Sequence, residues 1–314
     1  MSAEAAAAIR SISIVIVNWN SDALLDRCLA SLTAAGAEAA EVIVVDNGSV
    51  DRSLDACQHR PGVRVIRNGE NLGFGRACNI GARAARGAVL LFLNPDCEVR
   101  DGSLERCLAS LADPTIGVCG IALVDEHGSI ARSCHRFPTF GSFAGRILGL
   151  HVLSRRFSDG AMTAWAHDSD DDVDHVIGAF YMIRRALFDA LGGFDERFFV
   201  YLEDLDLSLR VHRSGHRIRF LAHPASFHLG GGVSRQAKAR RLFYATRSRI
   251  VFAYKHFPSW QAHLHLAMTL LLEPLTRSCL ALARGSGDGM RETLRAFGWV
   301  WHDLRPTLRL ARRP

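Results

Sequence analysis

Blocks of apolar and polar positions alternate along most of this chain. Residues 12–18 (ISIVIVN) are almost all apolar and mostly β-branched, the pattern of a strand that is buried on both faces of a parallel sheet. The apolar residues from Leu24 to Leu32 then recur with the spacing of one helical stripe. The pattern therefore predicts a strand followed by an amphipathic helix, with Ser21 or Asp22 as the helix N-cap.

The same alternation predicts the rest of an α/β domain. Residues 125–172 show no periodicity, and we expect a mobile loop or a variable insertion there. Strands that alternate with helices indicate a Rossmann-like sheet, mixed but mainly parallel, with helices on its faces and right-handed crossovers. Strands are expected at 41–46, 63–67, 88–94, 117–123, 175–185, 217–221 and 225–228, and helices at 75–86, 102–112 and 203–213.

The last part of the chain has a helical and basic character. Residues 235–314 contain 15 lysines and arginines against 4 acidic residues, in a chain whose net charge is +6. They contain no zinc-finger or RNP sequence, so we favour an anionic membrane surface over nucleic acid as their partner. We expect two domains, a catalytic one at 10–235 and a basic helical C-terminal region at 236–314.

Residues 260–283 are apolar enough to raise the question of a membrane span. The longest run without a charged residue, from Leu264 to Leu272, has only nine residues before Glu273 and Pro274. A spanning helix needs about 20 apolar residues, so we predict no transmembrane helix here. Two arrangements stay open: an amphipathic segment in the membrane interface with Trp260 as an anchor, or a helix packed on the first domain.

Several classes of protein are excluded by what the sequence lacks. The eight cysteines form no CxxC pair, which argues against a zinc ribbon and for free thiols in a reducing compartment. The N-terminal stretch MSAEAAAAIR is too short and too weakly apolar for a signal peptide, so a cytoplasmic location is expected. The GxGxxG fingerprint and the P-loop are both absent, which excludes dinucleotide binding of that type and P-loop NTPases.

Polar residues follow the predicted strands at the edge where open α/β sheets bind ligands. Asp46 ends the second strand, where a carboxylate could accept a hydrogen bond from a nucleobase or a ribose, or simply form a turn. Asn94-Pro95-Asp96 ends another strand, and its carboxylate suits a hard divalent cation that bridges a diphosphate. His228, in FHLGGGVS, could complete the metal shell, although a single histidine at a strand end is often structural.

An acidic cluster lies in residues 196–210 among aromatic side chains. Glu203 and Asp204 are adjacent, with Glu196 and Asp206 nearby, in the segment FFVYLEDLDLSLR and just before it. Dry surroundings raise the pKa of a carboxyl group and make it usable as a base. Acidic residues are also favoured at a solvated helix N-terminus, so this segment alone leaves both interpretations open.

Five motifs in order along the chain resemble one family. They are VVDNGS, NLGFGRACN, LLFLNPD, GGFDERFFVYLEDLDL and HLGGG. Their order and spacing are similar to those of the inverting GT-A glycosyltransferases of family 2, in particular the rhamnosyltransferase-like branch of bacterial cell-surface polysaccharide synthesis. The resemblance covers about residues 10–256, including RSCHRFPT at 132–139 and YKHF at 254–257.

The resemblance implies a binding site for a nucleotide-diphosphate sugar. Asn18 and Asp46 would line the nucleotide pocket, with Asp46 facing the base. Asn71, Gly73 and Asn79 would shape the pocket around the nucleotide. Thymine and uracil present the same N3–H group, so Asp46 does not distinguish a dTDP-sugar from a UDP-sugar.

The resemblance also implies a Mg²⁺ or Mn²⁺ site. Asp96 is similar to the metal-holding aspartate of the DxD motif, and His228 to a histidine that supplies a further ligand. The first position of the motif is Asn94 here, which leaves one negative charge fewer for the metal. Contacts with the diphosphate or the acceptor are expected from Arg132, Arg136 and Gly231.

Asp204 resembles the catalytic base, with Glu203 as the alternative. The expected reaction is an inverting transfer of L-rhamnose from dTDP-L-rhamnose to a glycan or a lipid-diphosphate-linked sugar. A UDP-sugar donor (galactose, GlcNAc or glucose) and a non-catalytic protein that binds nucleotide-sugar or acts as a scaffold are the alternatives. We expect the enzyme at the inner face of the cytoplasmic membrane, and leave its oligomeric state open, a homodimer included.

Overall fold

The computed structural model describes residues 8–150, 160, 162, 165–230 and 238–312. The chain forms two compact units. The sheet unit consists of Met1–His135, Met162–Glu196 and Glu203–Val233, and the helical unit of Arg136–Ala161, Arg197–Leu202 and Ser234–Pro314. The expected functional division between 10–235 and 236–314 stays a prediction.

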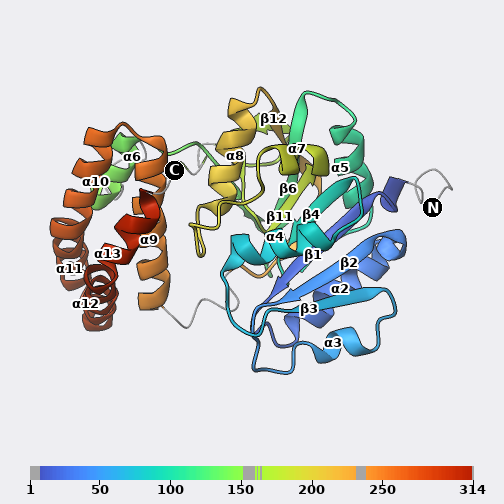
Figure 1. Cartoon of the computed structure of the whole chain (residues 1–314), viewed down its shortest axis with the longest axis horizontal. Helices are drawn as coiled ribbons and strands as arrows, with labels where there is room; N and C mark the ends of the chain where they lie inside the picture. Colours follow the sequence, from blue (N-terminus) through green and yellow to red (C-terminus); the bar gives the residue numbers. More distant parts are fainter. Residues whose placement is uncertain (1–7, 151–159, 161, 163–164, 231–237, 313–314) are drawn as a thin grey trace. The chain divides into compact units, whose positions relative to one another are not determined.

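A twisted mixed sheet forms the centre of the sheet unit (Figure 1). Its strands lie in the order β3-β2-β1-β4-β11-β6-β12-β5, and β1 pairs in parallel with both β2 and β4. The chain therefore reverses its direction of winding between β1 and β4, which is the position where such sheets bind ligands. These strands are β1 (Ile12–Asn18), β2 (Glu41–Asp46), β3 (Val63–Arg67), β4 (Val89–Leu93), β5 (Cys97–Glu98), β6 (Ile116–Val124), β11 (Phe180–Arg184) and β12 (Arg217–His228).

The remaining strands extend or border this sheet. β11 runs antiparallel between β4 and β6, whereas β12 runs parallel to β6, so the sheet is mixed but mainly parallel, as predicted. The short strands β7 (Ile130–Ala131) and β9 (Asp171–Val173) pair with β6 and β12. Two further short strands, β8 (Cys134–His135) and β10 (His175–Val176), form a separate pair.

Helices cover both faces of the sheet, which explains the uninterrupted apolar pattern of the first strand. β1 buries Ile12, Ile14 and Ile16 in one core cluster and Val15 and Val17 in the other. Helices α2 and α5 pack on the first cluster, and α4, α7 and α8 on the second. The helices of this unit are α2 (Leu24–Ala34), α3 (Asp55–Gln58), α4 (Phe74–Ala84), α5 (Ser103–Leu111), α7 (Arg185–Ala190) and α8 (Glu203–Arg213), with a 3₁₀ turn at Ala37–Ala39.

Four local predictions were wrong. The expected strand at 175–185 is divided into β10 and β11, and the two strands expected between 217 and 228 are one strand with a register shift between Leu221 and Ser226. Helix α2 has Ala23 as its N-cap, without a side-chain hydrogen bond. Residues 125–172 are not irregular throughout, because they include β7, β8, β9 and helix α6 (Phe140–Ile147).

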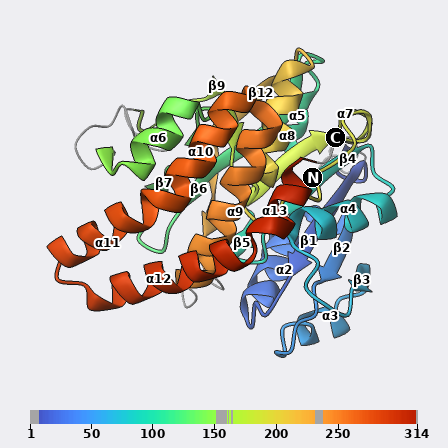
Figure 2. The ribbon, with the colours of Figure 1, turned by 60° about the vertical axis from the view of Figure 1, so that its left-hand side comes forward.

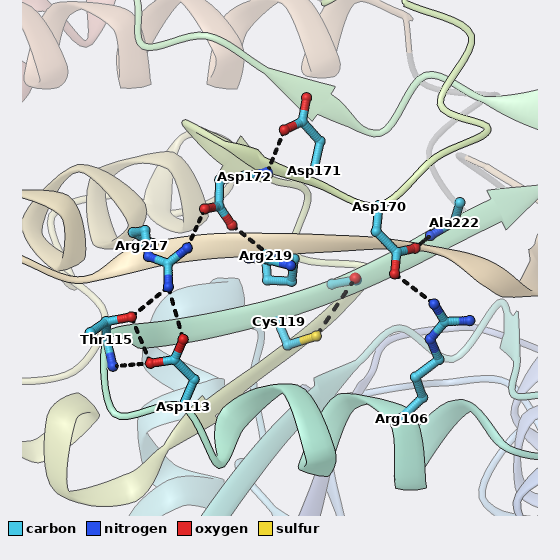
Figure 3. A network of polar contacts seen from close by, with 11 residues as sticks. Arg106, Asp113, Thr115, Cys119, Asp170, Asp171, Asp172, Arg217, Arg219 and Ala222 are labelled. Carbon is cyan, nitrogen blue, oxygen red and sulfur yellow. Dashed lines mark hydrogen bonds and ion pairs between the residues drawn. The ribbon is translucent and has the colours of Figure 1, made fainter.

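The Asp-rich stretch at 168–174 is ordered by arginines (Figure 3). Asp172 accepts hydrogen bonds from Arg217 at 2.5 Å and from Arg219 at 2.6 Å, both on β12. Asp170 accepts one from Arg106 of α5 at 2.6 Å. These ion pairs accompany the pairing of β9 with β12, so the charge pattern of the stretch has a structural explanation.

The helical unit is built from α6 and five C-terminal helices (Figure 2). Phe143 of α6 packs edge-on against Phe252 and Phe257, and Thr276 Oγ1 donates to the carbonyl of Ile147. No single helix among the described residues is long and apolar enough to cross a membrane, while α10 and α11, bent by 42°, pass that length and composition test only as a pair. The C-terminal helices are α9 (Lys238–His256), α10 (Ser259–Leu271), α11 (Glu273–Ala283), α12 (Gly287–His302) and α13 (Leu304–Ala311).

Candidate active site

The ends of β1 and β2 bring two of the expected nucleotide-binding residues together. Asn18 lies opposite Asp46 in the parallel register, and its Nδ2 donates to Asp46 Oδ1 at 3.1 Å and to Ser53 Oγ at 2.9 Å. Ser21 Oγ donates to Asn18 Oδ1, and Ser49 N donates to Asp46 Oδ2 at 3.3 Å. The loop after β2 is thereby folded against the end of β1, and Asp46 is 4% exposed.

Asn47 organises the neighbouring loop, although it was not among the residues predicted to bind the nucleotide. Its Nδ2 donates to the carbonyl of Gly73 at 3.1 Å and to Asn71 Oδ1 at 3.3 Å. Asn71 Oδ1 also accepts from Gly73 N at 3.0 Å, and Asn68 Nδ2 donates to Asn47 Oδ1. Gly73 has a φ of 88°, which favours glycine at the start of α4. Asn71 and Gly73 therefore lie beside the end of β2.

Asn79 is engaged in a different contact, inside the sheet unit. Its Nδ2 donates to the carbonyl of Phe194 at 2.8 Å, and its Oδ1 accepts from Phe194 N at 2.9 Å. A third bond joins Nδ2 to Glu196 at 3.1 Å. An added Cβ at Gly193 would lie 2.7 Å from Asn79 Oδ1, so this amide holds the turn at 192–196 against α4.

Asp96 and His228 meet because β5 pairs with the end of β12. Cys97 lies opposite His228 in that antiparallel pair, and Leu229 N donates to the carbonyl of Asp96. His228 Nε2 lies 3.3 Å from Asp96 Oδ1, but the geometry is not that of a hydrogen bond, and this buried nitrogen has no hydrogen-bond partner among the described residues. An unsatisfied imidazole nitrogen beside a carboxylate is the arrangement that a shared cation would complete.

Among the described residues, Asp96, Cys97 and His228 form a group whose ligand atoms lie within 4.8 Å of one another. Cys97 is an unsuitable member, because burial and the Asp96 carboxylate raise the pKa of its thiol well above the usual range. Its Sγ donates to the carbonyl of Ala179 instead. One carboxylate and one imidazole fit Mn²⁺ or Mg²⁺ and leave other coordination positions for ligand oxygens. Asn94, at the other end of NPD, is partly buried directly after β4.

Glu203 and Asp204 begin α8, and their environments differ. Glu203 is 5% exposed, and in the described part of the chain its buried Oε2 has no hydrogen-bond partner. Burial and then the neighbouring Asp204 raise the pKa of Glu203 well above its usual range, so the carboxyl stays protonated to a higher pH than an exposed glutamate. The Asp204 side chain is 18% exposed, and its oxygens accept from Gly178 N at 2.7 Å and Leu205 N at 2.8 Å.

A buried polar chain lies behind Asp204. His175 Nε2 lies 3.7 Å from Asp204 Oδ2, and His175 Nδ1 is 2.9 Å from Ser208 Oγ, which also contacts the hydroxyl of Tyr181. Burial lowers the pKa of His175 to about 4, so its imidazole is neutral at physiological pH. The i, i+4 spacing of Asp204 and Ser208 could have revealed Ser208. His175 and Gly178 gave no such signal, because they come from a distant segment.

The backbone is unusual next to these residues. Four of the five described non-glycine residues with positive φ are Asn20 (48°) and Asp22 (49°) after β1, and Tyr201 (70°) and Leu202 (68°) before α8. Such conformations cost about 1–3 kcal/mol each and are concentrated at functional sites. The unusual backbone conformations therefore flank two predicted sites, the nucleotide-binding end of β1 and the acidic start of α8.

The remaining acidic and basic residues singled out in the sequence lie in other surroundings. Asp206 is fully buried and forms an ion pair with Arg210 at 2.8 Å, which makes it a structural residue. Arg132 is exposed after β7, and Arg136 belongs to the helical unit, where its backbone N–H donates to Gly160. Gly231 lies outside the described residues.

Known proteins resemble this chain over most of its length. An N-acetylglucosaminyl-diphospho-decaprenol L-rhamnosyltransferase of Mycobacterium tuberculosis is 30% identical over 271 residues, 80% of this chain and 87% of the relative. The rhamnosyltransferase WbbL of Escherichia coli is 28% identical over 218 residues, 66% of this chain and 79% of its own.

Solved structures share the fold at lower sequence identity. A mannosyltransferase from Pyrobaculum calidifontis, solved with GDP-Man and Mn²⁺, superposes with a TM-score of 0.54 at 17% identity, covering 96% of this chain and 85% of that one. GalNAc-T7, solved with UDP, GalNAc and Mn²⁺, gives 0.52 at 22% identity over 69% of this chain and 42% of its own. These likenesses confirm the predicted GT-A fold.

The family model for glycosyl transferase family 2 matches residues 13–192, which include β1 to β4, the NPD segment and β11. This match confirms the resemblance on which the sequence-based expectations rest: the chain belongs to glycosyl transferase family 2 and is a glycosyltransferase.

Proposed function

We propose that this glycosyltransferase moves L-rhamnose, with inversion, from a nucleotide-diphosphate donor to a sugar on a lipid diphosphate, in the synthesis of a cell-surface polysaccharide. The observation that supports this most is the 30% identity, over 80% of the chain, to a relative named for L-rhamnosyl transfer to N-acetylglucosaminyl-diphospho-decaprenol. WbbL, also named a rhamnosyltransferase, supports the same sugar.

Asp204 is the proposed base. Its carboxylate is partly exposed and oriented by two backbone N–H groups, so it can take the proton of an acceptor hydroxyl. As that oxygen forms its bond to the anomeric carbon, the bond from this carbon to the diphosphate oxygen breaks, and the configuration inverts in one step. Glu203 is less suited to this role because its carboxyl is buried, whereas an acceptor hydroxyl must be able to reach the base.

The donor would lie along the carboxyl edge of the sheet. Asn18 and Asp46 are proposed to bind the nucleoside, and Asn71 and Gly73 to shape the adjacent wall. Asp96 and His228 would hold Mg²⁺ or Mn²⁺, which offsets negative charge on the leaving diphosphate when it is bound. In the part of the chain that the structure describes, Asn79 is already bonded to Phe194, so we propose a supporting role for it.

The lipid-linked acceptor implies a location. An acceptor anchored in a bilayer must be reached from the membrane surface, and the region after residue 235 is strongly basic. We therefore propose a peripheral enzyme at the inner face of the cytoplasmic membrane, with the sheet unit responsible for the chemistry.

The test is a donor panel with and without acceptor. Purified protein is incubated with Mg²⁺ or Mn²⁺, a GlcNAc-diphosphate-lipid and dTDP-L-rhamnose, UDP-galactose, UDP-GlcNAc or UDP-glucose, and the released nucleotide diphosphate and the glycolipid product are measured. Acceptor-dependent transfer from dTDP-L-rhamnose alone is the expected result. Transfer from a UDP-sugar would overturn the choice of rhamnose, and nucleotide-sugar binding without any transfer would favour a binding protein.

Substitutions at the two adjacent carboxyl residues, Asp204 and Glu203, test which of them is the catalytic base. Asp204→Asn should lower kcat at least about 100-fold, since removing a general base costs on the order of 10²–10⁴-fold. Glu203→Gln, which keeps the shape of a protonated glutamate, should stay within about 3-fold of the wild type if burial keeps Glu203 neutral. The reverse pattern would transfer the role of base to Glu203.

A further inference from the structure

In the α10–α11 segment of the helical unit, polar side chains are buried and large apolar side chains are exposed. The fully buried residues of the segment are small or polar, whereas several of its large apolar residues are exposed. Relative exposure is 63% for Trp260, 43% for Leu264, 66% for Leu271, 63% for Leu275 and 60% for Leu282. The buried residues are Ala262, His265, Thr269, Glu273 and Pro274. A helix packed in a water-soluble protein normally has the opposite arrangement.

The outward residues form one continuous surface, here called the apolar face. Along α10 and α11 they are separated by four or seven positions, which places them on one side of each helix. Helix α12 lies beside α11 in Figure 2 and exposes Leu294 and Trp301, which are seven positions apart and so lie on one side of that helix. These two residues are included in the apolar face. Nine of the twelve exposed large apolar residues in the described chain lie between 260 and 301, so the exposure is concentrated rather than scattered.

The polar groups of the segment are satisfied on its inner side. Glu273 accepts from Arg249 at 2.8 Å and from Arg277 at 2.8 Å, and is 1% exposed. Thr276 donates to backbone carbonyls of the same unit. Between residues 259 and 283 Glu273 and Arg277 are the only acidic or basic residues other than histidines, and both belong to this network. The α10–α11 part of the apolar face therefore contains no exposed carboxylate, lysine or arginine, which suits a hydrocarbon environment.

The residues around the apolar face indicate which partner covers it. Trp260 at the start of α10 and Trp301 near the end of α12 are both exposed, and tryptophan is enriched at the boundary of a bilayer. Exposed arginines follow directly, at 284, 291 and 295, and residues 238–312 contain 13 lysines and arginines against 4 acidic residues. An apolar surface bordered by tryptophans and cations matches the acyl chains and phosphates of an anionic bilayer.

The length of the helices limits how deep they can lie. The 13 residues of α10 extend about 20 Å, shorter than the roughly 30 Å of a bilayer's hydrocarbon core. The two helices are also bent by 42° at Leu272. Because one side of this bent segment is buried within the helical unit and the other is exposed, the segment fits a position along one leaflet better than a span across both.

We propose that the apolar face of α10–α12 is immersed in the outer acyl-chain layer of one leaflet of an anionic membrane. The attachment is then mainly hydrophobic, with the arginines adding attraction to lipid phosphates. This inference does not depend on the donor or acceptor proposed above, because it concerns the helical unit alone.

The test compares vesicle binding of the full chain and two variants, without any sugar substrate. Vesicles of phosphatidylcholine with phosphatidylglycerol are used in a flotation assay at 0.1 and 0.5 M NaCl. The wild type should bind at both salt concentrations, because screening affects the arginines and not the leucines. Leu271→Gln combined with Leu275→Gln should lower the partition coefficient about 100-fold, since each leucine contributes about tenfold.

Controls distinguish this proposal from other occupants of the face. Val50→Gln changes an exposed residue of the sheet unit (91% exposed) and should bind vesicles like the wild type. Lipids brominated on their acyl chains should quench the fluorescence of Trp260, and Trp260→Phe should lose that part of the quenching. Unchanged binding of the double variant, or complete release by salt, would overturn the proposal. A lipid-free dimer that the double variant converts to monomers would assign the face to self-association instead.

Discussion

At the scale of residues, the position of Asp204 depends on groups that the sequence does not place near it. Gly178 N donates to Asp204 Oδ2, and His175 lies on the same oxygen at 3.7 Å. His175 lies on β10, and Gly178 lies between β10 and β11. In the chain, β11 and α7 separate both residues from α8. They touch the proposed base and not the reacting atoms, so they act as positioning residues.

Gly178 should be intolerant of a side chain. A Cβ added there would lie 3.2 Å from Asp204 Oδ2 and 3.3 Å from Asp204 Cβ, closer than such atoms normally approach. We expect Gly178→Ala to lower kcat about 10- to 100-fold with little change in the KM for the donor, because small misplacements of a catalytic group are costly. Gly298→Ala, where the added atom meets nothing within 4 Å, is the control and should leave steady-state kinetics unchanged.

His175 should make the stability of the protein depend on pH. Its pKa is lowered from 6.5 to about 4 by burial, so the unfolded chain binds a proton between these values that the folded chain does not. Stability is then complete above about pH 6.5 and decreases as the pH falls towards 4, by about 3 kcal/mol for this shift.

Urea unfolding at pH 7 and pH 4.5 measures this contribution. The wild type should lose more free energy of unfolding between the two values than His175→Gln does. His127→Gln, at a histidine whose side chain is 78% exposed, should lose as much as the wild type. Equal losses in all three proteins would show that His175 is not held neutral by the fold.

At the scale of elements, strong apolar patterns were predictable and tertiary contacts were not. β1, β2, β3 and α8 lie where hydrophobic periodicity placed them, because burial on one or both faces leaves a direct pattern. α6 was missed since its capping box uses Thr139 and Ser142 and its helix has only eight residues. The expected strand at 175–185 divides where Gly178 turns to meet Asp204, a contact that no local pattern reveals.

The buried ion pairs of Glu273 should contribute strongly to the attachment of α9 to α11. Arg249 and Glu273 are 7% and 1% exposed, so removing the carboxylate leaves a buried cation without its partner. We expect Glu273→Gln to lower the free energy of unfolding by about 3 kcal/mol. The matched change Asp288→Asn, in an ion pair that is more than four-fifths exposed on both sides, should cost less than about 0.5 kcal/mol. Denaturant unfolding followed by circular dichroism compares them, and equal losses would contradict this view of the network.

At the scale of the whole molecule, the sequence predicted the helices and the functional residues better than it predicted which side of a helix is buried. Asp46 ends β2 and Asp96 follows β4, two strands whose ends converge at one edge of the sheet, and Asp204 lies at the start of α8 in the same unit. For α10 and α11 the sequence indicated an apolar segment. Two arrangements stayed open: a helix packed on the first domain, or a segment in the membrane interface. Periodicity measures how residues are spaced around a helix and not which side is buried, so only the structure, in which His265 and Glu273 are buried, shows which side faces inward.

If the helical unit binds lipid and the sheet unit transfers sugar, the two activities should separate in one variant. Leu271→Gln with Leu275→Gln should lower transfer to an acceptor embedded in vesicles about 100-fold at limiting lipid, because less enzyme reaches the surface. Donor hydrolysis, and transfer to a water-soluble short-chain acceptor, should stay within about 2-fold, since neither leucine belongs to the sheet unit. Val50→Gln should leave both rates unchanged. An equal loss with both acceptors would mean that the apolar face supports catalysis itself, and the proposed division between membrane attachment and chemistry would be wrong.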